Sequence, residues 1–312
     1  MQVREGFVES QGHRLAYLAV NEHLLVDEMG PVIIFIHGIL ASINFWRDCV
    51  PLSFKEQRPW YSLSLPAHHP SSVPDDFESE QVNDQWFFQV MNGALKNLLG
   101  TKSAIIIGHS TGGFCAINLA LHQAPNVSAI ISVAGFHSGK WGGFEGLLVE
   151  LAGMGNWTKG LFVANLKLFQ TNLFMQRVFS ASLAHDKTEY FLNPRSEQLL
   201  VNIFPNINKQ NYADLFPLFQ GINTIDIADE LKKIQVPCYI FACTRDPVVS
   251  TEQSMKLSSE IPHAKTVTFR TSGHMPFIED TAAYFSALEH AIADIAESIK
   301  HKQGETDELS RV

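Results

Sequence analysis

Short apolar runs alternate with longer amphipathic segments along most of the chain. PVIIFI at residues 31–36, AIII at 104–107 and VSAIISV at 127–133 are almost wholly apolar, which is typical of strands buried on both faces of a sheet. Residues 2–20 alternate apolar and polar positions and predict an opening β-hairpin. We predict further strands at 60–65, 237–243 and 265–270, and helices at about 80–99, 114–121, 227–234, 251–259 and 276–300. Because strands and helices alternate, the pattern indicates parallel βαβ units.

The alternation is interrupted between residues 137 and 225. This segment is rich in Phe, Leu, Trp and Asn, shows helical spacing and contains no clear strand. We therefore predict an α/β core domain formed by residues 1–136 and 226–300, with a helical insertion at 137–225. The polar residues 301–312 are predicted to form a frayed C-terminal tail.

One strand-to-helix junction carries the motif Gly-x-Ser-x-Gly. Gly108, Ser110 and Gly112 supply it directly after the apolar run at 104–107. A serine in such a sharp turn is presented as a nucleophile, and the glycines let the neighbouring chain pass close beside it. The alternative is a glycine-rich turn that only packs a helix or binds a phosphate. Because neither Gly-Lys-Ser/Thr nor G-x-G-x-x-G stands at this turn, Ser110 is our candidate nucleophile.

A serine hydroxyl needs a base that removes its proton and a carboxylate that orients this base. Asp246 and His274 each follow a predicted strand in the last third of the chain. Taken singly, such residues are more often turn, helix-cap or surface-loop residues. The order Ser110, Asp246, His274 at the ends of parallel strands, however, places all three at one edge of the sheet. We therefore predict a catalytic triad, with Asp226 as the next candidate for the acid.

The negative charge of a tetrahedral intermediate requires fixed hydrogen-bond donors. The backbone amide of Thr111, directly after the serine and at a helix N-terminus, is one candidate, and the amide of Ile39 is the other. His37 is predicted to brace the loop of Ile39 through hydrogen bonds and not to act as a second base. The pair His68-His69 has no further metal-binding side chain at ligand spacing. We therefore expect this pair to face solvent or the rim of a pocket, and we expect neither a metal nor another cofactor.

These loops resemble the signature loops of the α/β-hydrolase superfamily. The matching stretches, within residues 10–136 and 226–298, are His37-Gly38, Gly108-His109-Ser110-Thr111-Gly112, Thr244-Arg245-Asp246 and Gly273-His274-Met275-Pro276-Phe277-Ile278-Glu279. The resemblance implies Ser110 as nucleophile, His274 as general base and acid, Asp246 as its orienter, and Ile39 with Thr111 as oxyanion donors. It also implies the α/β-hydrolase fold, an eight-stranded, mostly parallel sheet flanked by helices, with the insertion as a cap over the active site.

Two loops bear on the details of this resemblance. Many members have Asp-x-x-Gly-x-Gly-x-Ser where this chain has SLPAHHPS at residues 64–71, so the geometry of this loop is expected to differ. Some relatives place the acid one strand earlier, after the strand that ends near Val133. Because no carboxylate occurs between Ala134 and Lys140, the sequence favours Asp246 as the acid.

The composition of the chain limits which partners and which cellular location we expect. The chain of 312 residues is 46% hydrophobic and 18% charged, as in a globular protein, and its formal net charge of −9 argues against a nucleic-acid partner. The four cysteines show no CxxC spacing and are expected to be buried thiols. Arg4, Glu5 and Glu9 stand where a signal peptide would need an apolar core, and no run approaches a membrane span. We therefore expect a cytoplasmic protein.

The insertion indicates the substrate class. Most of its Phe and Leu side chains are expected in helix cores, but a subset is expected to line an apolar pocket for the acid part of an ester or thioester. We therefore predict a cofactor-independent serine hydrolase that cleaves a small carboxylic ester of an apolar acyl or aromatic acid through an acyl-serine intermediate. The alternatives are C–C bond hydrolysis, lactone opening or acyl transfer by the same triad, and a small-molecule receptor with slow turnover. Peripheral attachment to a lipid surface through exposed apolar side chains of the insertion is a further alternative.

Overall fold

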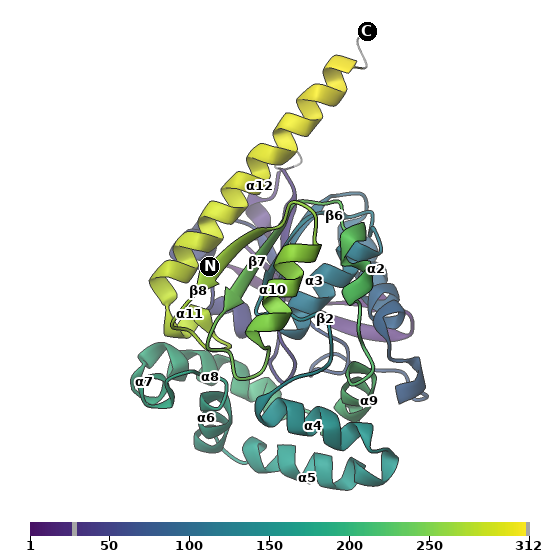
Figure 1. Cartoon of the computed structure of the whole chain (residues 1–312), viewed down its shortest axis with the longest axis vertical. Helices are drawn as coiled ribbons and strands as arrows, with labels where there is room; N and C mark the ends of the chain where they lie inside the picture. The colour runs from purple at the N-terminus through teal and green to yellow at the C-terminus, as the bar shows by residue number, and fades with distance from the viewer. Residues whose placement is uncertain (27–29, 310–312) are drawn as a thin grey trace.

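Eight strands form a single sheet at the centre of the molecule (Figure 1). The computed structural model describes residues 1–26 and 30–309, with residues 302–309 as backbone only. The strands are β1 Val3–Ser10, β2 His13–Val20, β3 Val32–Ile36, β4 Trp60–Leu63, β5 Ala104–His109, β6 Val127–Val133, β7 Cys238–Cys243 and β8 Lys265–Phe269. Their order is β1-β2-β4-β3-β5-β6-β7-β8. The pairs β1–β2 and β2–β4 are antiparallel, and every other neighbouring pair is parallel, which confirms the predicted fold class.

Alternate residues of the central strands face two separate apolar cores. In β3, Val32, Ile34 and Ile36 belong to one core, whereas Ile33 and Phe35 belong to the other. The first core is shared with α2, α3 and α10, and the second with α12. These four helices span Asp84–Leu99, Thr111–Leu121, Thr251–Glu260 and Thr281–Leu309. Burial on both faces explains why these strands are continuous apolar runs.

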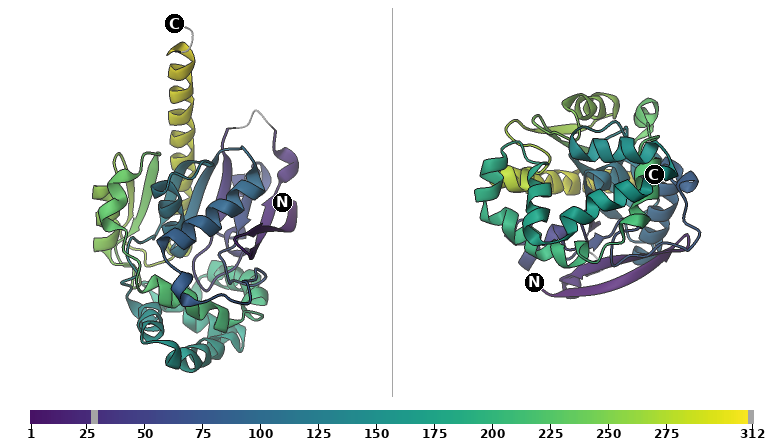
Figure 2. Two further views of the ribbon diagram at one scale, coloured as in Figure 1. Left: turned by 90° about the vertical axis from the view of Figure 1, so that its right-hand side faces the viewer. Right: turned by 90° about the horizontal axis from the view of Figure 1, so that it is seen from below.

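Between β6 and residue 225 the chain folds into helices that gather at one end of the sheet (Figures 1 and 2). They are α4 Gly143–Gly153, η4 Asn156–Thr158, α5 Lys159–Gln170, α6 Leu173–Ala181, α7 Lys187–Leu192, α8 Pro194–Ile207 and α9 Tyr212–Ile222. An isolated bridge between Ser138 and Asp226 joins the two ends of the segment. The chain therefore leaves and re-enters the body of the sheet at neighbouring points.

Two helices in the core differ in detail from the sequence prediction. The helix expected from residue 80 begins at Asp84, because the Asn83 side chain caps it by accepting a hydrogen bond from the Trp86 amide at 2.8 Å. The segment expected as a helix at 227–234 is the 3₁₀-helix η5, Ala228–Lys233. The short helices η1 Glu22–Leu24, η2 Phe45–Arg47, α1 Leu52–Glu56 and η3 Ser79–Gln81 occupy the loops.

The C-terminal region differs more. The single helix expected at 276–300 is two helices, α11 Pro276–Glu279 and α12, with Asp280 between them in a non-helical conformation. The helix α12 continues to Leu309 and extends away from the sheet (Figure 1). The prediction of a frayed tail is therefore wrong up to Leu309, and residues 310–312 lie outside the described residues. Lys, Gln, Glu and Leu, which are good helix formers, dominate this last stretch.

Within residues 1–26 and 30–309, none of the helices combines the length and the apolar content that a span requires.

Candidate active site

Ser110 lies in a strained turn between β5 and α3. Its backbone has φ 54° and ψ −117°, a conformation that a side chain makes costly. A Cβ atom on Gly108 would stand 1.9 Å from the Gly112 carbonyl oxygen, and one on Gly112 would stand 2.2 Å from the Ile36 carbonyl oxygen. Only glycine fits at both positions. The close packing around these two glycines therefore holds the serine at the apex of the turn.

Asp246 and His274 come together at the adjacent strand ends. The Nδ1 atom of His274 and the Oδ2 atom of Asp246 are 2.7 Å apart, and both side chains are almost completely buried. The second carboxylate oxygen of Asp246 accepts hydrogen bonds from the amides of Val248 and Val249 at 2.8 and 2.9 Å. The carboxylate is therefore fixed by its own loop and turned toward the imidazole ring.

The pKa of His274 reflects two opposing influences. Burial alone lowers it, but the charge of Asp246 and its hydrogen bond to the ring raise it above its ordinary value. Because the carboxylate can only accept, Nδ1 carries a proton and Nε2 is the nitrogen left to take up another. This is the tautomer that a general base toward a serine requires.

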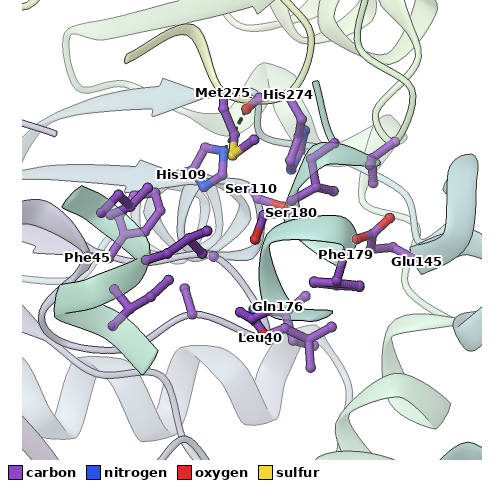
Figure 3. Close-up of a pocket in the computed structure, with 18 of the residues that line it drawn as sticks. Leu40, Phe45, His109, Ser110, Glu145, Gln176, Phe179, Ser180, His274 and Met275 are labelled. Carbon is purple, nitrogen blue, oxygen red and sulfur yellow. Dashed lines mark hydrogen bonds between the residues drawn. The ribbon is translucent and has the colours of Figure 1, made fainter. Parts of the chain in front are cut away.

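Ser110 and His274 line the same pocket at the ends of β5 and β8 (Figure 3). Two of the three predicted triad residues, Ser110 and His274, therefore line one pocket. The third, Asp246, is hydrogen-bonded to His274 and does not itself line the pocket. Asp226, the other candidate for the acid, is half-exposed and lies 3.5 Å from His137 Nδ1. Because the Nδ1 atom of His274 is hydrogen-bonded to Asp246 and the carboxylate of Asp226 faces His137, Asp226 is not the partner of His274.

The two predicted oxyanion donors flank Ser110. Thr111 is the first residue of α3, where backbone amides have no partner within the helix. Ile39 lies in the loop after β3 and lines the pocket with Ser110, and no hydrogen bond to another described residue occupies its amide. Both amides are thus available to a negatively charged oxygen at the serine.

His37 holds this loop through its ring. Because a carbonyl can only accept, Nδ1 donates to the Gly38 carbonyl oxygen at 2.8 Å, and Nε2 accepts from the Leu65 amide at 3.3 Å. Burial, together with the neighbouring His68, lowers the pKa of His37 to about 3. His37 is therefore neutral and already engaged at both nitrogens.

His68 corrects the sequence prediction. We expected the His68-His69 pair at the solvent or the pocket rim, but His68 is fully buried and does not line the pocket. Its Nδ1 donates to the Pro66 carbonyl oxygen at 2.8 Å, and its Nε2 accepts from the Leu40 amide at 3.1 Å. Burial lowers its pKa to about 4. The residue thus fixes the backbone next to Ile39, in a loop that departs from the family pattern.

His109, the residue before the serine, supports the base. Its Nε2 donates to the backbone oxygen of His274 at 2.8 Å, and its ring stacks on Phe45 with centroids 5.3 Å apart. Burial lowers its pKa well below the ordinary value. Sequence reasoning gave His109 no role. Its position inside the Gly-x-Ser-x-Gly motif was the only signal for it.

The remaining wall of the pocket comes from the insertion. Half of the lining residues belong to it, and most are apolar: Trp141, Glu145, Gln176, Phe179, Ser180, Leu183, Tyr190, Leu199, Leu200 and Ile203. Of the many phenylalanines in the insertion, Phe179 lines this pocket, whereas Phe162 and Phe216 are buried in helix packing and Phe174 is exposed. The sequence missed the polar members of this wall, because burial of a helix face depends on what packs against it.

Comparisons with known proteins agree with this fold. The family model described as "alpha/beta hydrolase fold" matches residues 31–281. A pimeloyl-[acyl-carrier protein] methyl ester esterase from Vibrio atlanticus is 23% identical over 84% of this chain and 95% of its own length. Among solved structures, the enol-lactonase from Burkholderia xenovorans LB400 (16% identity, TM-score 0.71) covers 92% of this chain and 100% of its own. An esterase from Thermogutta terrifontis (14% identity, TM-score 0.68) covers 94% of this chain and 99% of its own. The chain therefore belongs to the α/β-hydrolase fold family.

Proposed function

We propose that this protein is a serine hydrolase that cleaves carboxylic esters or thioesters through an acyl-serine intermediate. One observation carries the proposal. The imidazole of His274 is hydrogen-bonded to Asp246 at 2.7 Å and shares a pocket with Ser110, which sits in a strained turn at a helix N-terminus. The similarity to esterases in sequence supports the same reaction class.

The geometry suggests the following order of proton transfers. Ser110 Oγ attacks the ester carbonyl while His274 Nε2 takes the hydroxyl proton, and the Asp246 carboxylate stabilises the imidazolium that forms. The amides of Ile39 and Thr111 bind the oxyanion. His274 then gives its proton to the leaving alcohol or thiol, and the acyl group stays on Ser110. A water molecule repeats the sequence, releases the acid and restores the serine.

The pocket supports a substrate with an apolar acid part. Its walls are mainly aliphatic and aromatic and include Leu199, Leu200 and Ile203 from α8 and Leu40 and Ala41 from the loop after β3. Such side chains stabilise an apolar group by removing its surface from water. A panel of p-nitrophenyl esters of rising acyl length would define the size that the pocket accepts.

An active-site label tests the reaction. A fluorophosphonate probe should modify Ser110, identified by mass spectrometry of the labelled peptide, and Ser110→Ala should abolish the label. Ser180 lines the same pocket from α6 but lacks the strained turn, so Ser180→Ala is the matched control and should still be labelled. If the folded wild-type protein takes up no label, the hydrolase proposal fails and a small-molecule receptor on the same fold becomes the better interpretation.

The outer helices of the insertion support a proposed attachment to lipid surfaces. Trp157, Leu161 and Phe174 are 78%, 57% and 67% exposed, and they belong to η4, α5 and α6 at the end of the molecule farthest from the tip of α12 (Figure 1). Exposed aromatic and leucine side chains can insert into the boundary of a bilayer. Co-sedimentation with vesicles of anionic phospholipid should fall when Trp157 and Phe174 are changed to Ser. Unchanged sedimentation would contradict this attachment.

A further inference from the structure

Glu145 is a buried acid with no partner inside the pocket. It lies in the first turn of α4, is 4% exposed, and forms no hydrogen bond with either carboxylate oxygen among the described residues. Figure 3 shows its carboxylate directed toward the side of the pocket on which Ser180 is drawn. Apart from histidines, it is the only charged side chain among the described residues that line this pocket.

The start of α4 is fixed against the loop of the catalytic acid. The Gly142 amide donates to the Val248 carbonyl oxygen at 2.7 Å, and a Cβ atom on Gly142 would stand 2.5 Å from the Pro247 carbonyl oxygen. This tight contact brings the first turn of α4 next to the residues that follow Asp246. The position of Glu145 is therefore set by the same loop that holds the triad.

A second, partly buried acid, Glu279, illustrates a structural role. The Glu279 carboxylate accepts hydrogen bonds from the amides of His185 at 2.7 Å and Met275 at 3.4 Å. It thereby ties the insertion to the loop of His274. Glu145 has no such bonds, and a buried carboxyl group without partners destabilises the fold. Because Glu145 does not stabilise the fold through such hydrogen bonds, we expect the partner of its carboxylate to be a bound molecule.

The electrostatic environment of Glu145 is compatible with this role. Burial raises its pKa to about 7, while its own backbone amide and His274 act in the opposite direction. A hydrogen-bond donor that enters the pocket would favour the ionised form. The pocket thus contains an acceptor whose charge a hydrogen-bond donor would stabilise.

We infer that Glu145 is a specificity residue that accepts a hydrogen bond from a donor group on the substrate. This inference rests on the proposed ester hydrolysis and narrows its substrate class. The substrate combines an apolar body with a hydroxyl, amide N–H or ammonium group placed away from the scissile carbonyl. A wholly apolar ester leaves Glu145 unpaired and is the poorer substrate.

Matched substrates test this inference. We would compare p-nitrophenyl esters of equal acyl length that end in a methyl, hydroxyl, primary amide or ammonium group, and a second series with the same groups in the alcohol half. The wild-type protein should prefer at least one donor-bearing substrate over its methyl counterpart in kcat/KM. Because hydrogen bonds to charged groups are strong, Glu145→Leu should reduce that preference by about 10- to 100-fold. The same variant should improve turnover of the methyl substrate.

Two further variants complete the experiment. Glu145→Gln keeps the side-chain volume and an acceptor oxygen, so it should retain a part of the preference and show that the pocket is intact. Glu150 is exposed on the same helix, and Glu150→Gln should leave all substrate ratios unchanged. If Glu145→Leu lowers kcat/KM for every substrate by one factor, or if no donor-bearing substrate is preferred, the inference is wrong. Fluorophosphonate labelling of Ser110 is measured on the wild type and on each variant. Labelled protein without a preference for donor-bearing substrates refutes the inference on Glu145, whereas absence of labelling in the wild type refutes the proposed hydrolase activity.

Discussion

Replacement of Glu145 by Gln should change how the stability of the protein depends on pH. The carboxyl group is buried, and its pKa is about 7 in the folded protein against an ordinary value of 4.5. The folded state therefore binds a proton more tightly than the unfolded state. Stability is highest where the group is protonated in both states, and it falls as the pH rises through 4.5 toward 7.

The magnitude follows from these two pKa values. Their difference corresponds to about 3 kcal/mol of unfolding free energy that is lost between low and high pH. Between pH 5 and pH 8 the loss is about 2 to 3 kcal/mol, because part of it occurs below pH 5. Gln cannot ionise, so Glu145→Gln should not show this component. The variant should therefore gain stability relative to the wild type as the pH rises.

Urea unfolding at several pH values measures this effect. Tryptophan fluorescence and far-UV circular dichroism should give coincident transitions, which justifies a two-state free energy. The difference between Glu145→Gln and the wild type should increase by about 2 to 3 kcal/mol from pH 5 to pH 8. Glu150→Gln, at an exposed position of the same helix, is the control and should show a constant difference. A constant difference for Glu145→Gln as well would refute the reasoning, because it would mean that the carboxyl group is solvated or paired.

Four other predictions concern the triad, the turn and the helix α5. Asp246→Asn should keep the fold and lower kcat by about 10⁴-fold, because the imidazole loses its oriented tautomer; a loss below tenfold would point to another acid. The kcat/KM of the wild type should fall as the pH drops through the raised pKa of His274, since an imidazolium cannot take the serine proton. Asp246→Asn should move the midpoint of its remaining pH profile downward, as measured from initial rates. Gly112→Ala should prevent folding, because its Cβ would stand 2.2 Å from a backbone oxygen. Gly160→Ala, which meets nothing within 4 Å, should stabilise the α5 helix by up to about 1 kcal/mol in thermal unfolding.

The sheet and its strand-end loops were predictable because their signals are local. A buried parallel strand is a continuous apolar run, and the turn at Ser110 needs Gly108 and Gly112 within four residues of each other. Such patterns are visible in a few consecutive residues. Because parallel strands end at the same edge of a sheet, the sequence also indicates that the three catalytic loops meet there. This prediction needs no knowledge of side-chain packing.

The polar residues around the site were not predictable in the same way. His68 lies in a stretch of Pro and Ser that is typical of surface loops, yet it accepts a hydrogen bond from Leu40, 28 residues earlier in the chain. Glu145 stands on a helix whose buried face is decided by its contact with the loop of Pro247 and Val248. The residues next to His68 and Glu145 in the sequence do not indicate that these side chains are buried. Their burial depends on contacts between segments far apart in sequence.

The insertion and the sheet contribute to the pocket in different ways, with a consequence for how such a protein can change. Residues 141–203 form half of the pocket wall, while Ser110, Asp246 and His274 all belong to the core. An exchange of this stretch for a foreign one would thus alter which molecules fit and leave the proton transfers in place. The exchange must also preserve contacts with the core, among them the hydrogen bond in which the Leu183 carbonyl oxygen accepts the amide of His274 at 2.9 Å. A transplanted segment must supply an equivalent acceptor, or the backbone of His274 loses this hydrogen bond.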